Sequence, residues 1–278
     1  MLYRQEQGGI RLMTYLDIVL IALIQGVGSV LPLSAKGHFA LFTGLTADPQ
    51  AFAVVSVAVH LGVALGLMAW LWRDCLSLLV GMGKLVKGKS DPGGRLLLLL
   101  MVASLPSGLL AGWLLNTVAL PQGQLLAASC LLGFGLLMAV ADRLGVTVSR
   151  VEHLGYGTVA VLGLLQLLAL LPGVSRMGVT VTATRLLGLE RREAARLSML
   201  MAVPMLLGYG LFQLWHLTRA ISLVMSADLA LAAGLAALVA WAMAGLLLAW
   251  LRRHTFLPFA LWRIMLGVGV IALHFLSA

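Results

Sequence analysis

Residues 229–251, LALAAGLAALVAWAMAGLLLAWL, decide the fold because they run without a single charged side chain. An α-helix needs about 20 consecutive apolar residues to cross the hydrocarbon core of a bilayer, and this stretch is long enough. A membrane β-strand would alternate apolar and polar residues, and no such alternation occurs here. Because lipid offers no hydrogen-bond partner to the backbone, the stretch is predicted to be a transmembrane helix.

The composition of the whole chain indicates a membrane protein. Of the 278 residues, 61% are hydrophobic and 10% are charged, and the mean hydropathy is +1.04. Soluble domains carry about 25% charged residues, so the sequence predicts an all-α polytopic membrane protein. The predicted spanning helices lie at 51–72, 95–118, 124–142, 196–217, 227–252 and 258–276.

Charge and cysteine content argue against two classes of function. The net charge is +9, but no basic block is interleaved with aromatic residues. We therefore interpret the cations as loop residues that face anionic lipid, and we predict no nucleic-acid partner. The two cysteines, Cys75 and Cys130, predict neither a disulfide framework nor a metal site.

Two further apolar stretches, 14–46 and 153–184, are interrupted by glycine, proline and polar residues. Connections rich in Lys and Arg stay in the cytoplasm, and 73–95 is rich in them whereas 119–123 has none. The sides alternate without conflict only if each interrupted stretch enters and leaves the membrane on one side. Both stretches are therefore predicted to be re-entrant hairpins.

This arrangement predicts two inverted repeats, 14–142 and 153–276, each a hairpin followed by three transmembrane helices. It places both chain termini outside the cell. The chain begins with a polar tail at 1–13, and its true start is Met1 or Met13. A weak internal match at one offset of 141 residues agrees: Gln25, Ser34 and Gly37 recur as Gln166, Ser175 and Gly178. Inverted repeats with interrupted helices commonly enclose a polar site near the middle of the membrane.

The hairpins place Lys36, His38 and Arg176 at membrane depth, where an ionisable residue is costly and usually functional. Arginine beside Ser175 and glycine is typical of a phosphate site. A contact from Arg176 to helix-end carbonyls is the alternative. Ser34 precedes His38 by four residues, a helical spacing that allows a serine nucleophile with a histidine base, although His38 could equally be a core histidine.

His60, in the middle of the 51–72 span, is interpreted as a hydrogen-bonded core residue rather than a ligand. The sequence contains no carboxylate that clearly reaches the tips of the hairpins. The predicted pocket is therefore cationic and suited to bind a phosphate head group.

Three segments resemble the bacterial undecaprenyl-diphosphate phosphatase family, known for bacitracin resistance: ALIQGVGSVLPLSAKGHFAL, FAVVSVAVHLGVALGLMAWLWRD and PGVSRMGVT. The likeness covers most of the chain from Met13. It implies a multi-pass protein of the bacterial inner membrane that removes the terminal phosphate from a polyprenyl (undecaprenyl) diphosphate lipid and recycles the carrier for cell-wall synthesis. It also implies the inverted-repeat fold and allows a divalent cation, Mg²⁺ or Ca²⁺, as cofactor.

The family pattern assigns candidate roles to residues of both hairpins. It implies Ser34, His38 and Arg176 as catalytic residues. The predicted phosphate-binding residues are Gln25, Ser29, Lys36, Ser175, Gly178 and Thr180.

Four positions depart from the family pattern. Ser29 stands where the family has a glutamate, Ala35 and Met177 stand where it has serines, and Lys36 replaces a small hydroxyl residue. A carboxylate would bind a cation or take a proton. Two hypotheses remain: a phosphatase, or a degenerate relative that binds or translocates a polyprenyl phosphate without hydrolysis.

Overall fold

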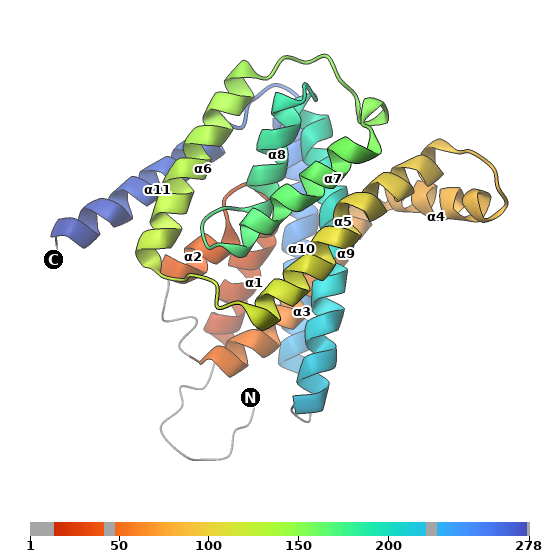
Figure 1. Cartoon of the computed structure of the whole chain (residues 1–278). Helices are drawn as coiled ribbons and strands as arrows, with labels where there is room; N and C mark the ends of the chain where they lie inside the picture. The colour runs from red at the N-terminus through yellow and green to blue at the C-terminus, as the bar shows by residue number, and fades with distance from the viewer. Residues whose placement is uncertain (1–13, 42–47, 221–226, 277–278) are drawn as a thin grey trace.

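The computed structural model describes residues 14–41, 48–220 and 227–276, and these residues form helices and connections but no β-strand. Figure 1 shows the helices as a bundle from which α11 and the α4–α5 pair project on opposite sides. The α-helices are α1 Tyr15–Val30, α2 Ala35–Leu41, α3 Pro49–Trp70, α4 Trp72–Val86, α5 Pro92–Thr117, α6 Gln124–Leu144, α7 Tyr156–Leu165, α8 Arg176–Leu186, α9 Arg191–Ala220, α10 Ala227–Trp250 and α11 Leu257–Leu276. Two short 3₁₀ helices occupy Val151–His153 and Gln166–Leu170.

Six of the described helices are long and apolar enough to cross a membrane, and they coincide with the six predicted spans. They are α3, α5, α6, α9, α10 and α11. Their starts have a local cause in the sequence. Asp48 and Asp91 accept hydrogen bonds from the first N–H groups of α3 and α5, and a proline follows each of them. The chain is a multi-pass membrane protein.

The prediction of a loop at 73–95 is wrong, because most of this segment is helix α4. Apolar residues spaced along one side of a helix explain the difference, since Leu76, Leu79 and Met82 line α4 and are exposed. Gly81 allows α4 to pack closely against the start of α5, where a Cβ atom would collide with the backbone. The hydrogen bond from Lys84, in the same connection, lowers the pKa of Asp91.

Each interrupted stretch forms a pair of short helices joined by a sharp turn: α1 and α2 in the first, α7 and α8 in the second. Ser34 (φ 74°) and Ser175 (φ 66°) immediately precede α2 and α8, and they alone among the described non-glycine residues have positive φ. Each hydroxyl oxygen accepts a hydrogen bond from the N–H three residues later, at 3.2 Å from Gly37 and 3.1 Å from Gly178. The two turns are therefore built alike, at positions that the 141-residue offset matched.

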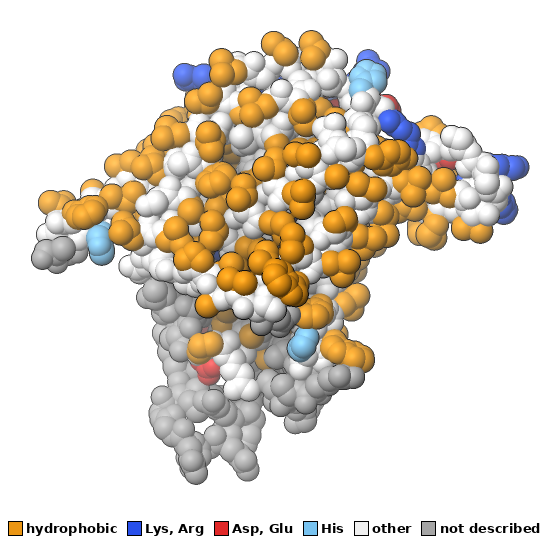
Figure 2. Space-filling view, viewed as in Figure 1, with side chains coloured by type: hydrophobic (Ala, Val, Ile, Leu, Met, Phe, Trp, Pro, Cys, Tyr) orange, Lys and Arg blue, Asp and Glu red, His pale blue; other side chains and the backbone are white. Residues whose placement is uncertain are grey.

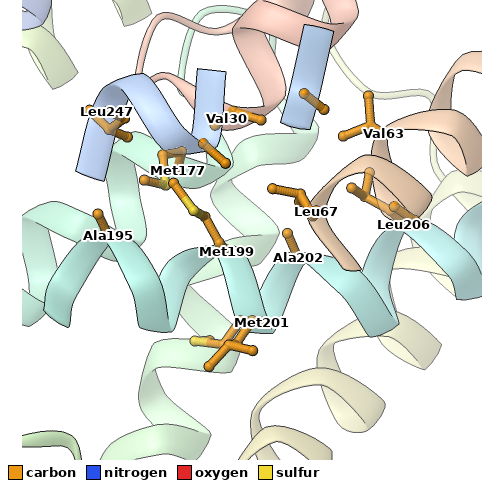
Figure 3. Close-up of a cluster of buried hydrophobic side chains, with 14 of the residues drawn as sticks. Val30, Val63, Leu67, Met177, Ala195, Met199, Met201, Ala202, Leu206 and Leu247 are labelled. Atoms are coloured by element: carbon orange, nitrogen blue, oxygen red, sulfur yellow. The ribbon is translucent and has the colours of Figure 1, made fainter. Parts of the chain in front are cut away.

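Small residues allow the long helices to approach closely. A Cβ atom at Gly62 or Gly66 of α3 would collide with the backbone of Ala233 or Ala237 of α10, a form of packing common between membrane helices. The core also reaches the turns: Figure 3 shows Met177 of α8 and Met199 of α9 in one apolar cluster with Val30 of α1. Apolar packing thereby fixes the two hairpins against α9.

A buried carboxylate joins four elements at one end of the bundle. Asp142 of α6 is 3% exposed and accepts hydrogen bonds from the guanidinium groups of Arg185 (3.3 Å) and Arg191 (2.7 Å). It also accepts one from the N–H of Phe256, which precedes α11. On the face drawn in Figure 2, hydrophobic side chains cover the flank, and the Lys and Arg side chains gather at the upper end and at the α4–α5 turn.

Candidate active site

The two hairpins meet at Arg176, the first residue of α8. Its guanidinium donates a hydrogen bond to the carbonyl oxygen of Ser29 in α1 (3.1 Å) and another to that of Ser198 in α9 (2.9 Å). The alternative contact, to helix carbonyls, is therefore present. A guanidinium has five N–H groups, so Arg176 retains donors without a partner among the described residues. Its role in holding phosphate stays a prediction.

Beside Arg176, the amide of Gln25 links α1 to α3. Its nitrogen lies 3.1 Å from the hydroxyl oxygen of Ser29 and 3.1 Å from Nε2 of His60. Gln25 is 7% exposed, so burial and two hydrogen bonds fix its orientation. Ser29 therefore contacts Gln25 through its hydroxyl and Arg176 through its carbonyl, and it joins both groups in one network.

His60 has the hydrogen bonds expected of a core histidine, but one of them leads into the candidate site. Its Nδ1 lies 2.6 Å from the carbonyl oxygen of Ser56. A carbonyl only accepts, so Nδ1 carries the proton and Nε2 accepts from Gln25. The ring packs 4.8 Å from that of Tyr209 on α9.

Lys36, on α2, is exposed and makes no hydrogen bond or ion pair within the described part of the chain. Its charge is near enough to act on the ring of His60. A close approach of the hairpin arms accounts for this, because Gly28 of α1 packs directly against Ala35 of α2. Lys36 is therefore the cation most available to a ligand.

The predicted pair Ser34 and His38 lies close together, but hydroxyl and ring are not hydrogen-bonded to each other. The Ser34 hydroxyl oxygen accepts from Gly37, and Nδ1 of His38 lies 2.8 Å from the Ser34 carbonyl oxygen. Nε2 of His38 accepts from the indole N–H of Trp262 on α11 (3.2 Å). Both nitrogens of the His38 ring thus hold the turn in place, and the catalytic roles of the pair stay a prediction.

The other predicted phosphate ligands are engaged in the structure of α8. The Ser175 hydroxyl caps the helix at Gly178, and the Thr180 hydroxyl donates to the carbonyl oxygen of Arg176 (2.9 Å). The guanidinium of Arg263 packs directly against Gly178, and a Cβ atom on residue 178 would collide with it. These three residues therefore position Arg176, and their direct contact with phosphate stays a prediction.

The sequence reasoning missed Arg263. This residue of α11 has 0% exposure and donates hydrogen bonds to the carbonyl oxygens of Gly173 and Val174 at 2.9 Å and of Pro32 at 3.4 Å. It therefore holds both turns at once. An arginine inside the apolar span 258–276 is the signal that could have revealed it.

The counterpart of Gln25 in the second hairpin is not equivalent in its contacts. Gln166 is 3% exposed, and neither its amide nitrogen nor its amide oxygen has a hydrogen-bond partner among the described residues. Of the two matching glutamines, only Gln25 in the first hairpin has hydrogen bonds through its amide within the described part of the chain.

The donor set does not fit a directly bound divalent cation. Mg²⁺ and Ca²⁺ take carboxylate and carbonyl oxygens, whereas the side chains here are two cations, an amide, a hydroxyl and an imidazole. No group of three or more His, Cys, Asp or Glu suited to a metal occurs among the described residues. Asp17 is the acidic residue nearest to Gln25 in sequence, and its carboxylate accepts hydrogen bonds from Thr14, the N-cap residue at the other end of α1. The group around Gln25 is therefore a cationic cluster, with Arg176 and Lys36 beside the imidazole of His60.

Comparison with known proteins identifies the family. Residues 18–269 match the family model described as bacitracin resistance protein BacA. The chain is 47% identical over 265 residues to "Undecaprenyl-diphosphatase 1" of Paramagnetospirillum magneticum, covering 94% of this chain and 98% of that protein. It is 43% identical to the protein of the same name from Rhodospirillum rubrum (95% and 97% covered) and 36% identical to "Undecaprenyl-diphosphatase" of Maricaulis maris (93% and 98% covered). Since the match extends over most of its length, the chain belongs to the bacitracin resistance protein BacA family.

Proposed function

We propose that this protein is an undecaprenyl-diphosphatase of the bacterial inner membrane, which hydrolyses the terminal phosphate of the polyprenyl diphosphate carrier. The observation that carries the proposal is the convergence of Arg176, Lys36 and the amide of Gln25 where the hairpins meet. Two cations and an amide donor in a site of low dielectric bind the negative charge of a diphosphate and stabilise its increase on the leaving group. The names of the relatives agree with this activity.

The architecture belongs to the same proposal. Residues 14–142 and 153–276 form two inverted repeats, and each hairpin re-enters the membrane from one side. The matching turns at Ser34 and Ser175 support the repeat, as does the alternation of cation-rich and cation-free connections. In this arrangement the lipid's isoprenoid chain lies in the bilayer and its diphosphate reaches Arg176 and Lys36 in the polar centre.

The chemical step has two candidates for proton transfer. The first is the predicted pair, with Ser34 as nucleophile and His38 as base. The Ser34 hydroxyl oxygen accepts a hydrogen bond from the N–H of Gly37, which would stabilise negative charge on this oxygen. To take its proton, however, the His38 ring must leave the Ser34 carbonyl and Trp262. The second candidate, His60, is argued in the next subsection.

Release of inorganic phosphate from undecaprenyl diphosphate by the purified protein in detergent tests the function. Turnover that persists after chelation of divalent cations is the expected result, because the cationic side chains neutralise the diphosphate. Binding of the lipid without phosphate release contradicts the proposal and makes the protein a lipid-phosphate binder or translocator.

A further inference from the structure

His60 is hydrogen-bonded on both sides within the candidate site. Nδ1 donates to the Ser56 carbonyl oxygen at 2.6 Å, and the lone pair of Nε2 points at the Gln25 amide at 3.1 Å. An imidazole held in this tautomer has its lone pair at Nε2, the atom that can accept a proton once the Gln25 amide moves away.

Among the described residues, no carboxylate is hydrogen-bonded to this ring. α10 has no titratable residue between 229 and 250, and from α9 the ring meets Tyr209. On α1, Asp17 lies at the far end, and on α4, Asp74 is paired with Arg196. The charged group that acts on His60 is Lys36 from α2.

Arg176 and Lys36 cannot take up a proton while they are charged, and Gln25 does not accept one at its amide nitrogen. Hydrolysis of a diphosphate by water nevertheless releases a proton from the attacking oxygen. Of the groups bonded to the Gln25–Ser29 pair, only the neutral imidazole can accept it.

We propose that His60 is the catalytic base of this protein, a role that rests on the proposed function. The terminal phosphate of the substrate draws the Gln25 N–H to itself and releases Nε2. A bond then forms between a water oxygen and the terminal phosphorus, and the bond from that phosphorus to the bridging oxygen breaks. The departing polyprenyl phosphate keeps the electron pair beside Arg176 and Lys36. The water proton moves to Nε2 and later leaves to solvent.

The same geometry supplies a way to replace His60. The Ser29 hydroxyl and His60 Nε2 both lie 3.1 Å from the Gln25 amide nitrogen. A carboxylate introduced at position 29 is therefore expected beside the same amide as the imidazole. It can take over the proton, which makes His60 dispensable.

The test measures phosphate release and lipid binding for wild type, His60→Gln, Ser29→Glu and the double variant in detergent. Glutamine at position 60 keeps a side-chain hydrogen-bonding group but cannot move a proton. His60→Gln is expected to lower kcat by about 10²–10⁴-fold with KM nearly unchanged. Ser29→Glu with His60→Gln is expected to recover much of the lost kcat. The matched control is His216→Gln, which replaces an exposed histidine on α9, and this variant is expected to keep the wild-type rate.

Three outcomes overturn the role of His60, and each has its own pattern. If His60→Gln keeps its turnover while Ser34→Ala or His38→Ala loses it, the proton passes through His38. If His60→Gln loses lipid binding together with turnover, the ring is a structural element of the pocket. If wild type itself binds undecaprenyl diphosphate and releases no phosphate, the proposed function fails first, before any variant is compared.

Discussion

Arg176 in the second hairpin donates a hydrogen bond of 3.1 Å to the carbonyl oxygen of Ser29 in the first. The bond joins residues that are far apart in the sequence, and a second bond, to Ser198, ties the same guanidinium to α9. The group that is proposed to bind phosphate therefore also holds the hairpins in register. Mutation of Arg176 must affect both properties.

Replacement of Arg176 by lysine separates charge from geometry. Lysine keeps the positive charge but lacks the planar fork that contacts two carbonyls and is proposed to bind a phosphate as well. A charge-assisted hydrogen bond contributes about 1.5–3 kcal/mol, so kcat/KM for phosphate release should fall by roughly 10–150-fold in Arg176→Lys. Arg176→Ala should lose more. Unchanged lipid binding and turnover in Arg176→Ala would remove this residue from the site.

Gln25 and Gln166 occupy matching positions in the two hairpins, so replacing each in turn tests which hairpin carries the chemistry. Gln25→Met removes the bonds to Ser29 and His60 and should abolish most phosphate release. Gln166→Met removes a buried amide that has no partner among the described residues, and such an unsatisfied amide costs about 1–3 kcal/mol. Its midpoint of thermal unfolding in detergent should therefore rise or stay constant, with activity kept. Equal loss of activity in both variants would contradict the assignment of the chemistry to the first hairpin.

Arg263 is expected to act through position rather than through contact with substrate. Arg263→Lys keeps the charge but cannot reach the three carbonyls of both turns together. Removing one partner from a buried, charged hydrogen-bond group typically costs several kcal/mol. The variant should unfold at lower temperature, and its kcat should fall more than its affinity for lipid changes. A variant with normal stability and normal kcat would show that the two turns keep their structure without the hydrogen bonds of Arg263.

Asp142 should be the most important acidic residue for stability. It is buried and bonded to Arg185, Arg191 and the backbone of Phe256. Breaking such a pair leaves buried cations without a counter-charge, which costs about 3–5 kcal/mol. Asp142→Ala should therefore reduce the yield of folded protein and its unfolding temperature. Asp91→Asn, at the exposed ion pair with Lys84, should change neither noticeably.

Cysteine labelling in intact cells tests the proposed orientation. In a background where Cys75 and Cys130 are replaced by alanine, a membrane-impermeant reagent should label Gln122→Cys. It should not label Gly88→Cys until the cells are opened, because the cation-rich α4–α5 turn is expected in the cytoplasm. The reverse pattern of labelling would refute the inverted-repeat topology.

Much of the fold was predictable, because the six spans follow from the apolar length that a bilayer requires. The helix α4 was not, since a short amphipathic helix carries the same cations as a loop. In the site, the offset that pairs Ser34 with Ser175 predicted two equivalent turns, and both adopt the same left-handed conformation. Arg176 lies where the hairpins meet and makes the carbonyl contacts that were weighed as the lesser alternative, and its role in binding phosphate stays a prediction.

The sequence by itself determined which segments are long and apolar enough to cross a membrane and where the chain turns. These properties depend on local composition, on apolar length and on the few residues that tolerate a sharp turn. Only the tertiary structure decided which polar groups meet. His60, read alone as a core residue, bonds to Gln25 of another helix, and Arg263 reaches both turns from α11. Such contacts depend on how helices distant in sequence pack, and hydropathy and spacing along one helix carry no information about that packing.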